Sequence, residues 1–186
     1  MSGHHLILGK ITDVITGETL DETHDEQYRQ KIAGLLVNQK KYQKKEIKPR
    51  LALTVRADTK KAVIPIDFVI TLSGKVGMII KFGPGSLVTR HRCLLAASRL
   101  IAPYQIPVVV VTNGKDADIL DGKTGKLISS GFENIPSRSE LMETIKIWDD
   151  EKIPGNRVEM ESRILYAYEV DGSCPCDDTI CRSMDE

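Results

Sequence analysis

Hydrophobic and polar residues alternate along residues 66–82, and this pattern predicts two antiparallel strands joined by a tight turn. Two turns are compatible with the spacing: Ser73-Gly74, or the three residues Ser73-Gly74-Lys75. A slip of one residue moves every side chain to the other face, so the turn decides which side chains share a face. The three-residue turn gives one face made only of large apolar residues: Ile66, Phe68, Ile70, Leu72, Val76, Met78, Ile80 and Phe82. We therefore predict this turn, which places Asp67 directly opposite Lys81.

The remaining pattern predicts helices on both faces of a central mixed β-sheet, an α/β fold. Two sequences of the form Ser/Thr-x-x-Glu, at Thr23 and Ser137, indicate helices that begin with a capping box. The predicted elements are a strand at 4–9, a helix from Thr23 to about 38, a strand at 51–57, a helix from a Ser86 cap to 101, a buried strand in 106–114, a hairpin turning at 121–125, a helix from Ser137 to 148, and a helix or strand at 158–169. We expect one domain over residues 1–148 and an extension over 149–186.

Composition limits the kinds of partner. The chain has 186 residues, 41% hydrophobic and 28% charged, which is ordinary for a globular protein. Basic and acidic residues balance at 26 each, so a nucleic acid must be bound by a local patch and not by global charge. No apolar run approaches the roughly 20 residues that cross a bilayer, and the expected location is the cytoplasm, with no membrane partner.

Asp67 and Lys81, adjacent on neighbouring strands, suit hydrolysis of a phosphodiester. The aspartate would hold Mg²⁺, and the lysine would position the attacking water and stabilise developing charge. The simpler alternative is a cross-strand ion pair, which contributes about 0.2–1 kcal/mol to strand pairing.

The order of elements around this pair resembles the PD-(D/E)xK restriction-endonuclease-like superfamily, and within it the N-terminal domain of type I restriction enzyme R subunits. The resemblance covers residues 22–121 and is carried by "DEQYRQKIAGLLV", "IDFVI", "IIKFGPG" and "VVVVTNG". It implies a restriction-endonuclease-like fold and catalytic roles for Asp67, Lys81 and Glu26. Ile79 stands where the family has its second metal-binding carboxylate.

That departure predicts that divalent-metal phosphodiesterase chemistry, in a DNA restriction or repair context, is weak or lost. Two alternatives stay open: a non-catalytic module that binds nucleic acid or forms complexes, and a structural domain with a cysteine-bound metal. DNA is the expected partner, and a homodimer or a larger restriction-type complex the expected assembly.

Basic residues supply the candidate DNA surface. The segment "QKKYQKKEIKPR" has six cations against one acid, Glu46, and Arg90 follows on the next predicted helix. The nucleic-acid-binding candidates are Lys40, Lys41, Lys44, Lys45, Lys48, Arg50 and Arg90.

Three cysteines crowd into the last thirteen residues: Cys174, Cys176 and Cys181. Thiolates this close suit Zn²⁺ or part of an iron–sulfur cluster, with a fourth ligand from Cys93, His4 or His5. The alternatives are a reduced terminus without metal and, for Cys93, a small core residue.

Overall fold

The apolar runs of the chain form a six-stranded mixed sheet in the computed structural model, which describes residues 6–171. The strand order is β3-β4-β5-β6-β7-β8, and only β5 and β6 run parallel to each other. The strands are β3 (Ile47–Ala57), β4 (Lys60–Leu72), β5 (Lys75–Phe82), β6 (Val108–Thr112), β7 (Ala117–Asp121) and β8 (Leu127–Ser130). The mixed α/β architecture is therefore confirmed. Every residue of β6 is buried, as its unbroken run of valines predicts.

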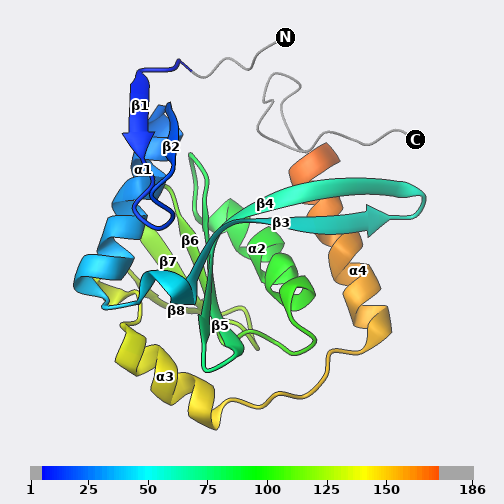
Figure 1. Cartoon of the computed structure of the whole chain (residues 1–186). Helices are drawn as coiled ribbons and strands as arrows, with labels where there is room; N and C mark the ends of the chain where they lie inside the picture. The colour runs from blue at the N-terminus through cyan, green and yellow to red at the C-terminus, as the bar shows by residue number, and fades with distance from the viewer. Residues whose placement is uncertain (1–5, 172–186) are drawn as a thin grey trace.

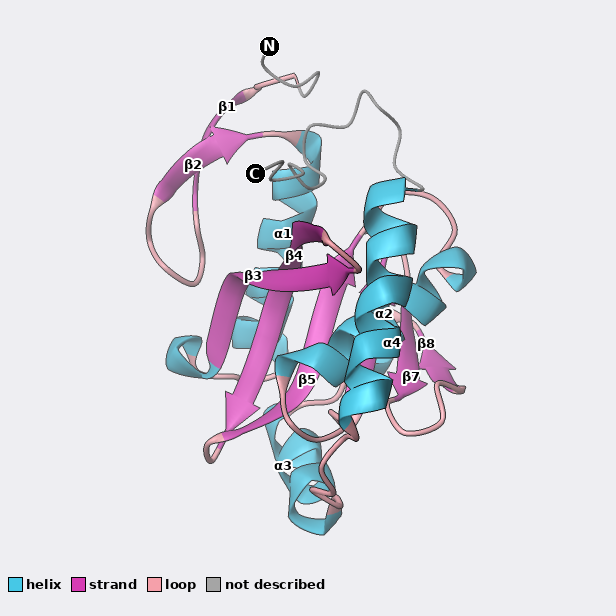
Figure 2. Cartoon of the chain, turned by 90° about the vertical axis from the view of Figure 1, so that its right-hand side faces the viewer, coloured by secondary structure: helices cyan, strands magenta, loops and turns pink. Residues whose placement is uncertain are grey.

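Helices cover both faces of the sheet (Figures 1 and 2). On one face α1 (His24–Gly34) and α3 (Arg138–Ile147) build a core with six residues of β4 and β5: Phe68, Ile70, Leu72, Met78, Ile80 and Phe82. On the other face α2 (Val88–Ile101) and α4 (Gly155–Tyr166) pack against Val69 and Ile79. The short helical segments are η1 (Leu35–Gln39), η2 (Lys44–Glu46), η3 (Phe132–Asn134) and η4 (Ala167–Asp171).

Helix starts show which capping predictions were right. Ser137 and Glu140 form a complete capping box at the start of α3. Thr23 caps α1 by accepting from the N–H of Glu26, but the Glu26 carboxylate bonds elsewhere and leaves the box half formed. The prediction that Ser86 caps the next helix was wrong, because α2 begins at Val88 and its N-cap residue is Leu87. The backbone carbonyl of Ser86 accepts a hydrogen bond from the Thr89 hydroxyl.

The turn between β4 and β5 also differs from the prediction. Leu72 pairs with Lys75, so the turn is the two residues Ser73 and Gly74, both with positive φ as a twisted two-residue hairpin turn requires. A β-bulge then places Gly77 as an extra residue, and the pairs beyond it are Ile70 with Met78 and Phe68 with Ile80. This is the register that was predicted, but the pairing ends at Phe68 with Ile80, one residue before Asp67 and Lys81. The bulge, and not the turn, supplies the one-residue shift.

Two residues of the predicted apolar face, Ile66 and Val76, lie in the other core. Val76 precedes the bulge and therefore has the opposite facing from Met78. The side-chain alternation of β4 is interrupted at Asp67, so Ile66, just before it, lies in the other core. The neighbouring strand β3 is also irregular at this level, because Arg50 has φ +50°. The other six residues of the predicted face share one core, so the patterning was right between the two irregularities.

The N-terminal segment forms a small two-stranded hairpin, where the sequence predicted a single strand. β1 (Gly9–Thr12) pairs with β2 (Thr19–Glu22) beside α1 (Figure 1). The strand predicted at 4–9 was misplaced, because residues 6–8 are not in a strand. At the other end, residues 158–169 are helical, and α4 packs on α2 and β3. Within residues 6–171, no helix is both long and apolar enough to cross a bilayer.

We predict that Gly122→Ala destabilises the fold by at least about 3 kcal/mol, because overpacking against backbone cannot be relieved by a rotamer change. A Cβ at Gly122 would lie 1.8 Å from the carbonyl oxygen of Ile106. The free energy of unfolding in urea measures the loss. Gly155→Ala is the matched control, because a Cβ there meets no atom within 4 Å and the change should cost less than about 0.5 kcal/mol. Equal losses in the two variants would contradict the account.

Candidate functional site

The candidate site lies where β4 separates from β5. β4 pairs with β3 along most of its length, but its pairing with β5 covers only Phe68 to Leu72. Asp67 is the first residue beyond that pairing, and its side chain is buried. Its Oδ2 accepts from the backbone N–H of Phe82 at 2.6 Å, which satisfies a donor at the end of β5. The carboxylate therefore holds the two strands together at the point of their separation.

The other oxygen of Asp67 is bound by a guanidinium from α1. Arg29 Nε donates to Asp67 Oδ1 at 2.6 Å, and Arg29 Nη1 lies 3.5 Å from Glu26 Oε2. The same guanidinium carbon lies 5.7 Å from the centre of the Phe82 ring, where a cation–π contact adds attraction. Burial acts to lower the pKa of Arg29, but the charge of Asp67 outweighs it and raises the pKa above its usual value. Arg29 is therefore a permanent cation between two carboxylates.

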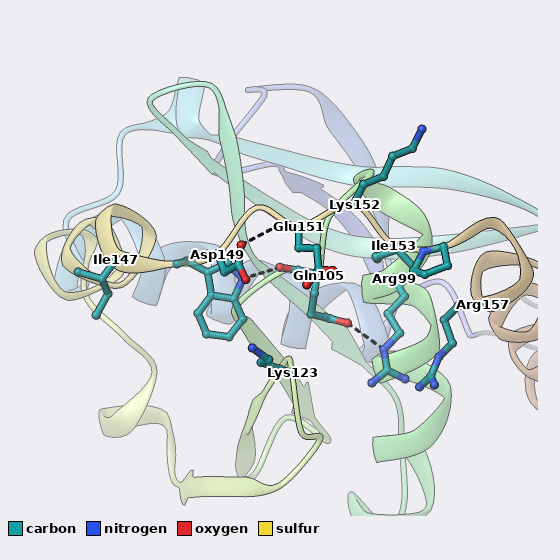
Figure 3. A pocket seen from close by; sticks show the side chains of 11 residues that line it. Arg99, Gln105, Lys123, Ile147, Asp149, Glu151, Lys152, Ile153 and Arg157 are labelled. Carbon is teal, nitrogen blue, oxygen red and sulfur yellow. Dashed lines mark hydrogen bonds between the residues drawn. The ribbon is translucent and has the colours of Figure 1, made fainter.

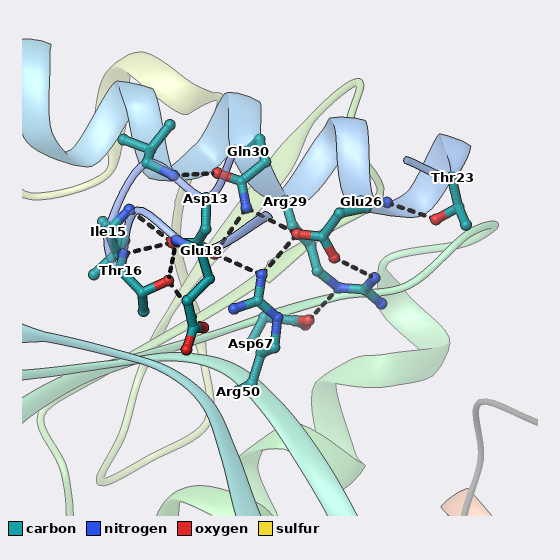
Figure 4. A network of polar contacts seen from close by, with 11 residues as sticks. Asp13, Ile15, Thr16, Glu18, Thr23, Glu26, Arg29, Gln30, Arg50 and Asp67 are labelled. Atoms are coloured by element: carbon teal, nitrogen blue, oxygen red, sulfur yellow. Dashed lines mark hydrogen bonds and ion pairs between the residues drawn. The ribbon is translucent and has the colours of Figure 1, made fainter. Parts of the chain in front are cut away.

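The charges continue from Glu26 toward the N-terminal hairpin (Figure 4). Arg50 Nη2 donates to Glu26 Oε1 at 2.8 Å and to Asp13 Oδ2 at 2.5 Å. Gln30 Nε2 donates to the same two carboxylates, at 2.8 Å to Glu26 and 3.0 Å to Asp13. Acids and bases thus alternate from Asp13 through Arg50, Glu26 and Arg29 to Asp67. We call these five residues the charge ladder.

Asp13, at one end of the ladder, has a pKa well below its usual value. Burial acts to raise the pKa of Asp13, but hydrogen bonds from the Thr16 N–H, Arg50, Gln30 and the Ile15 N–H outweigh it. The pKa of Asp13 therefore falls from 3.8 to about 2. These bonds favour the ionised form.

Lys81 does not contact the charge ladder but bonds to other partners. Its Nζ donates to the carbonyl of Pro65 at 3.0 Å and lies 3.4 Å from Glu169 Oε2, in η4. The other oxygen of Glu169 lies 3.4 Å from the Sγ of Cys93. Burial, and then the charge of Glu169, raise the pKa of Cys93 to about 12, so it is a neutral thiol in the core. The structure therefore brings Glu26 to Asp67 through Arg29, whereas the Lys81 ammonium group pairs with Glu169.

The predicted DNA-binding residues do not share one environment. Arg50 belongs to the charge ladder, while Arg90 donates to the carbonyl of Pro84. Lys40 and Lys41 donate to the carbonyls of Glu133 and Asn38. Of the remaining candidates, Lys44, Lys45 and Lys48 are exposed and form no ion pair with any described side chain.

The residues around Asp67 do not fit a divalent metal ion. Ile79, where the resemblance expects a carboxylate, is fully buried among apolar side chains. Between Asp67 and Glu26 stands the Arg29 guanidinium, whose charge repels a second cation. Within residues 6–171, no three His, Cys, Asp or Glu side chains come together as a metal site needs. The other predicted metal ligands, Cys174, Cys176 and Cys181, lie outside the described residues.

A family model for the N terminus of the type I restriction enzyme R protein matches residues 24–136 of the chain. The chain belongs to this family. Comparisons with curated proteins and with solved structures find no match. The match to the R-protein N terminus includes Glu26, Arg29, Asp67 and Lys81. It leaves out the first hairpin and the last helices.

Two acids of the site come from segments outside that match, and sequence reasoning missed both. Asp13 pairs with Arg50 from the loop after β1, and Glu169 pairs with Lys81 from η4. Neither contact has a local sequence signal, because the partners are 37 and 88 positions apart. Arg29 lies one helical turn after Glu26 in the predicted helix, and this spacing was a signal that the two side chains could pair.

We predict that Arg29→Ala lowers the free energy of unfolding by about 3 kcal/mol, because Asp67 loses its cation in a buried place. Urea denaturation measures the change. The double variant Arg29→Met/Asp67→Asn removes both charges and should recover most of the loss. A cost below about 0.5 kcal/mol for Arg29→Ala would show that the pair acts only as a surface ion pair.

A second prediction concerns pH. The pKa of Asp13 is depressed in the folded state, so its stabilisation is present above the unfolded value of 3.8 and is lost as pH falls toward about 2. Asp13→Asn lacks this contribution. The stability difference between the wild type and Asp13→Asn should therefore shrink by about 2 kcal/mol between pH 5 and pH 2. A difference that stays constant over this range would contradict the depressed pKa.

Proposed function

We propose that this chain is a DNA-binding domain of a restriction-type complex, built on a restriction-endonuclease-like fold, in which divalent-metal phosphodiesterase chemistry is weak or lost. The family match supports a restriction-related role. The fold assignment is supported by the order of elements: α1, the hairpin of β4 and β5, α2, and then β6 parallel to β5.

The observation that carries the loss of chemistry is the position of Arg29. Metal-assisted hydrolysis needs a cation that binds water and lowers its pKa. A guanidinium neutralises Asp67 and Glu26 electrostatically, but it cannot coordinate and activate a water molecule. Ile79 adds no ligand, and Lys81 is held by Glu169 under η4. The charge ladder therefore keeps the architecture of the site and removes its reactivity.

DNA binding is supported by lysine side chains around η2 that form no ion pair with a described side chain. Glu46 is the one acid of the basic segment, and Arg138 binds it with both Nε and Nη2 at 2.8–3.0 Å. Lys44, Lys45 and Lys48 are thus left exposed beside a neutralised carboxylate. Exposed lysines without internal partners are the groups that bind phosphates and release counterions.

Fluorescence anisotropy with duplex DNA at several salt concentrations tests this proposal. Lys44→Ala/Lys48→Ala should weaken binding about tenfold or more at low salt and reduce the salt slope by about 2, one for each phosphate contact. The charge-matched control is Lys10→Ala/Lys146→Ala, two lysines paired with exposed acids elsewhere, which should bind like the wild type.

The same samples are expected to leave the bound DNA uncut in Mg²⁺. Absence of salt-dependent DNA binding, or an equal loss in both double variants, would contradict the binding role. Cleavage that disappears in Asp67→Asn would contradict the loss of chemistry.

A further inference from the structure

A second polar region lies at the other end of the sheet from Asp67. Asp67 bonds to the end of β5, whereas Gln105 precedes the start of β6, which runs parallel to β5. Beside Gln105 is a cavity of about 590 Å³ (Figure 3). Pockets for small molecules measure roughly 300–1,000 Å³. The lining comes from the end of α2, the turn between β7 and β8, the segment joining α3 to α4, and α4 itself.

Cationic side chains line this cavity from four separate segments, and Lys152 extends away from the other three (Figure 3). Arg99, Lys123, Lys152 and Arg157 line it, against the carboxylates of Asp149 and Glu151. Arg99 and Arg157 share the buried carboxylate of Glu161, which Arg92 also binds. Lys123 and Lys152 form no ion pair with any side chain in residues 6–171. Asp149 and Glu151 form no ion pair in that part of the chain either, so the excess of positive charge is that of four lining cations over two lining carboxylates.

One residue fixes both the aromatic wall and the innermost cation. The backbone carbonyl of Gln105 accepts from the indole Nε1 of Trp148 at 2.7 Å, and its side-chain Oε1 accepts from Arg99 Nε at 2.8 Å. Ile153 N–H donates to the carbonyl of Pro103, which anchors the joining segment on the opposite rim. The walls are thus held before any ligand binds, which lowers the entropy cost of binding.

We propose that this cavity binds a nucleoside phosphate, with the base against Trp148 and the phosphate between Lys123 and Arg157. Any of the nucleic-acid bases can stack on an indole ring, and this stacking contributes about 1–3 kcal/mol to the binding free energy. Lysine and arginine supply the charge-assisted hydrogen bonds that phosphate oxygens accept. Ile153 and Pro154 add apolar surface to the lining. The phosphate belongs to a free nucleotide or to the end of a nucleic-acid strand.

Trp148 is the only tryptophan of the chain, so its fluorescence reports on this cavity alone. The whole chain is titrated with adenosine monophosphate, adenosine, inorganic phosphate, and a short single-stranded oligonucleotide with or without a terminal phosphate. Calorimetry repeats each titration, because a ligand can bind without changing the emission. We expect saturable binding of the nucleotide, and binding at least about tenfold weaker for adenosine or phosphate alone.

Variants locate the binding and separate it from the DNA surface. Lys123→Ala/Arg157→Ala should weaken nucleotide binding at least about tenfold, whereas Lys60→Ala/Lys61→Ala, at the tip of the β3–β4 hairpin, should leave it unchanged. Nucleotide binding should also persist in Lys44→Ala/Lys48→Ala, so failure of the DNA-binding proposal is distinguishable from failure of this one.

Two results would support the proposal and assign the source of the phosphate. Binding of the free nucleotide points to a nucleotide ligand, and binding only of the phosphorylated oligonucleotide points to a strand end. Absence of saturable binding by both methods, or binding that Lys123→Ala/Arg157→Ala leaves intact, would overturn it.

Discussion

The burial of the Asp67 carboxylate is the constraint on which the rest of the site depends. A buried charge without a partner costs several kcal/mol, and Asp67 lies where two strands separate, with the N–H of Phe82 bound to only one of its two oxygens. Arg29 meets that need and places α1 against the separation of the strands. Glu26 and Arg50 then pair in turn, and Asp13 ends the ladder on the N-terminal hairpin. One requirement for charge compensation thus links a hairpin, a helix and two strands of the sheet.

The same compensation accounts for the function that we propose. A position between two carboxylates is one that a divalent cation commonly takes in proteins, and here a side chain of the protein takes it. Lys81 is likewise paired with a side chain of the protein, Glu169, which lies in a helical segment outside the family match. A domain arranged in this way retains its shape and its surface lysines. We propose that it holds nucleic acid inside a larger complex and does not cut it.

The sequence predicted what depends on local patterns. Hydrophobic alternation located the faces of β4 and β5, and Ser137 with Glu140 marked the start of α3, because these signals arise between residues close in sequence. The turn was wrong because a bulge at Gly77 shifts the register as a longer turn would, and the apolar pattern cannot distinguish the two. The ion pair of Lys81 with Glu169 joins segments distant in sequence, so only the folded chain reveals it.

Calorimetric titration of Mn²⁺ into the wild type, Asp67→Asn, Arg29→Leu and Arg29→Leu/Asp67→Asn tests the central claim most directly. If Arg29 occupies the cation position, the wild type should show no binding that depends on Asp67. Removing the guanidinium should open the position, so that Arg29→Leu binds Mn²⁺ and the double variant does not. Wild-type binding that is lost in Asp67→Asn alone would contradict the account, because it would show that a metal ion and Arg29 are held together.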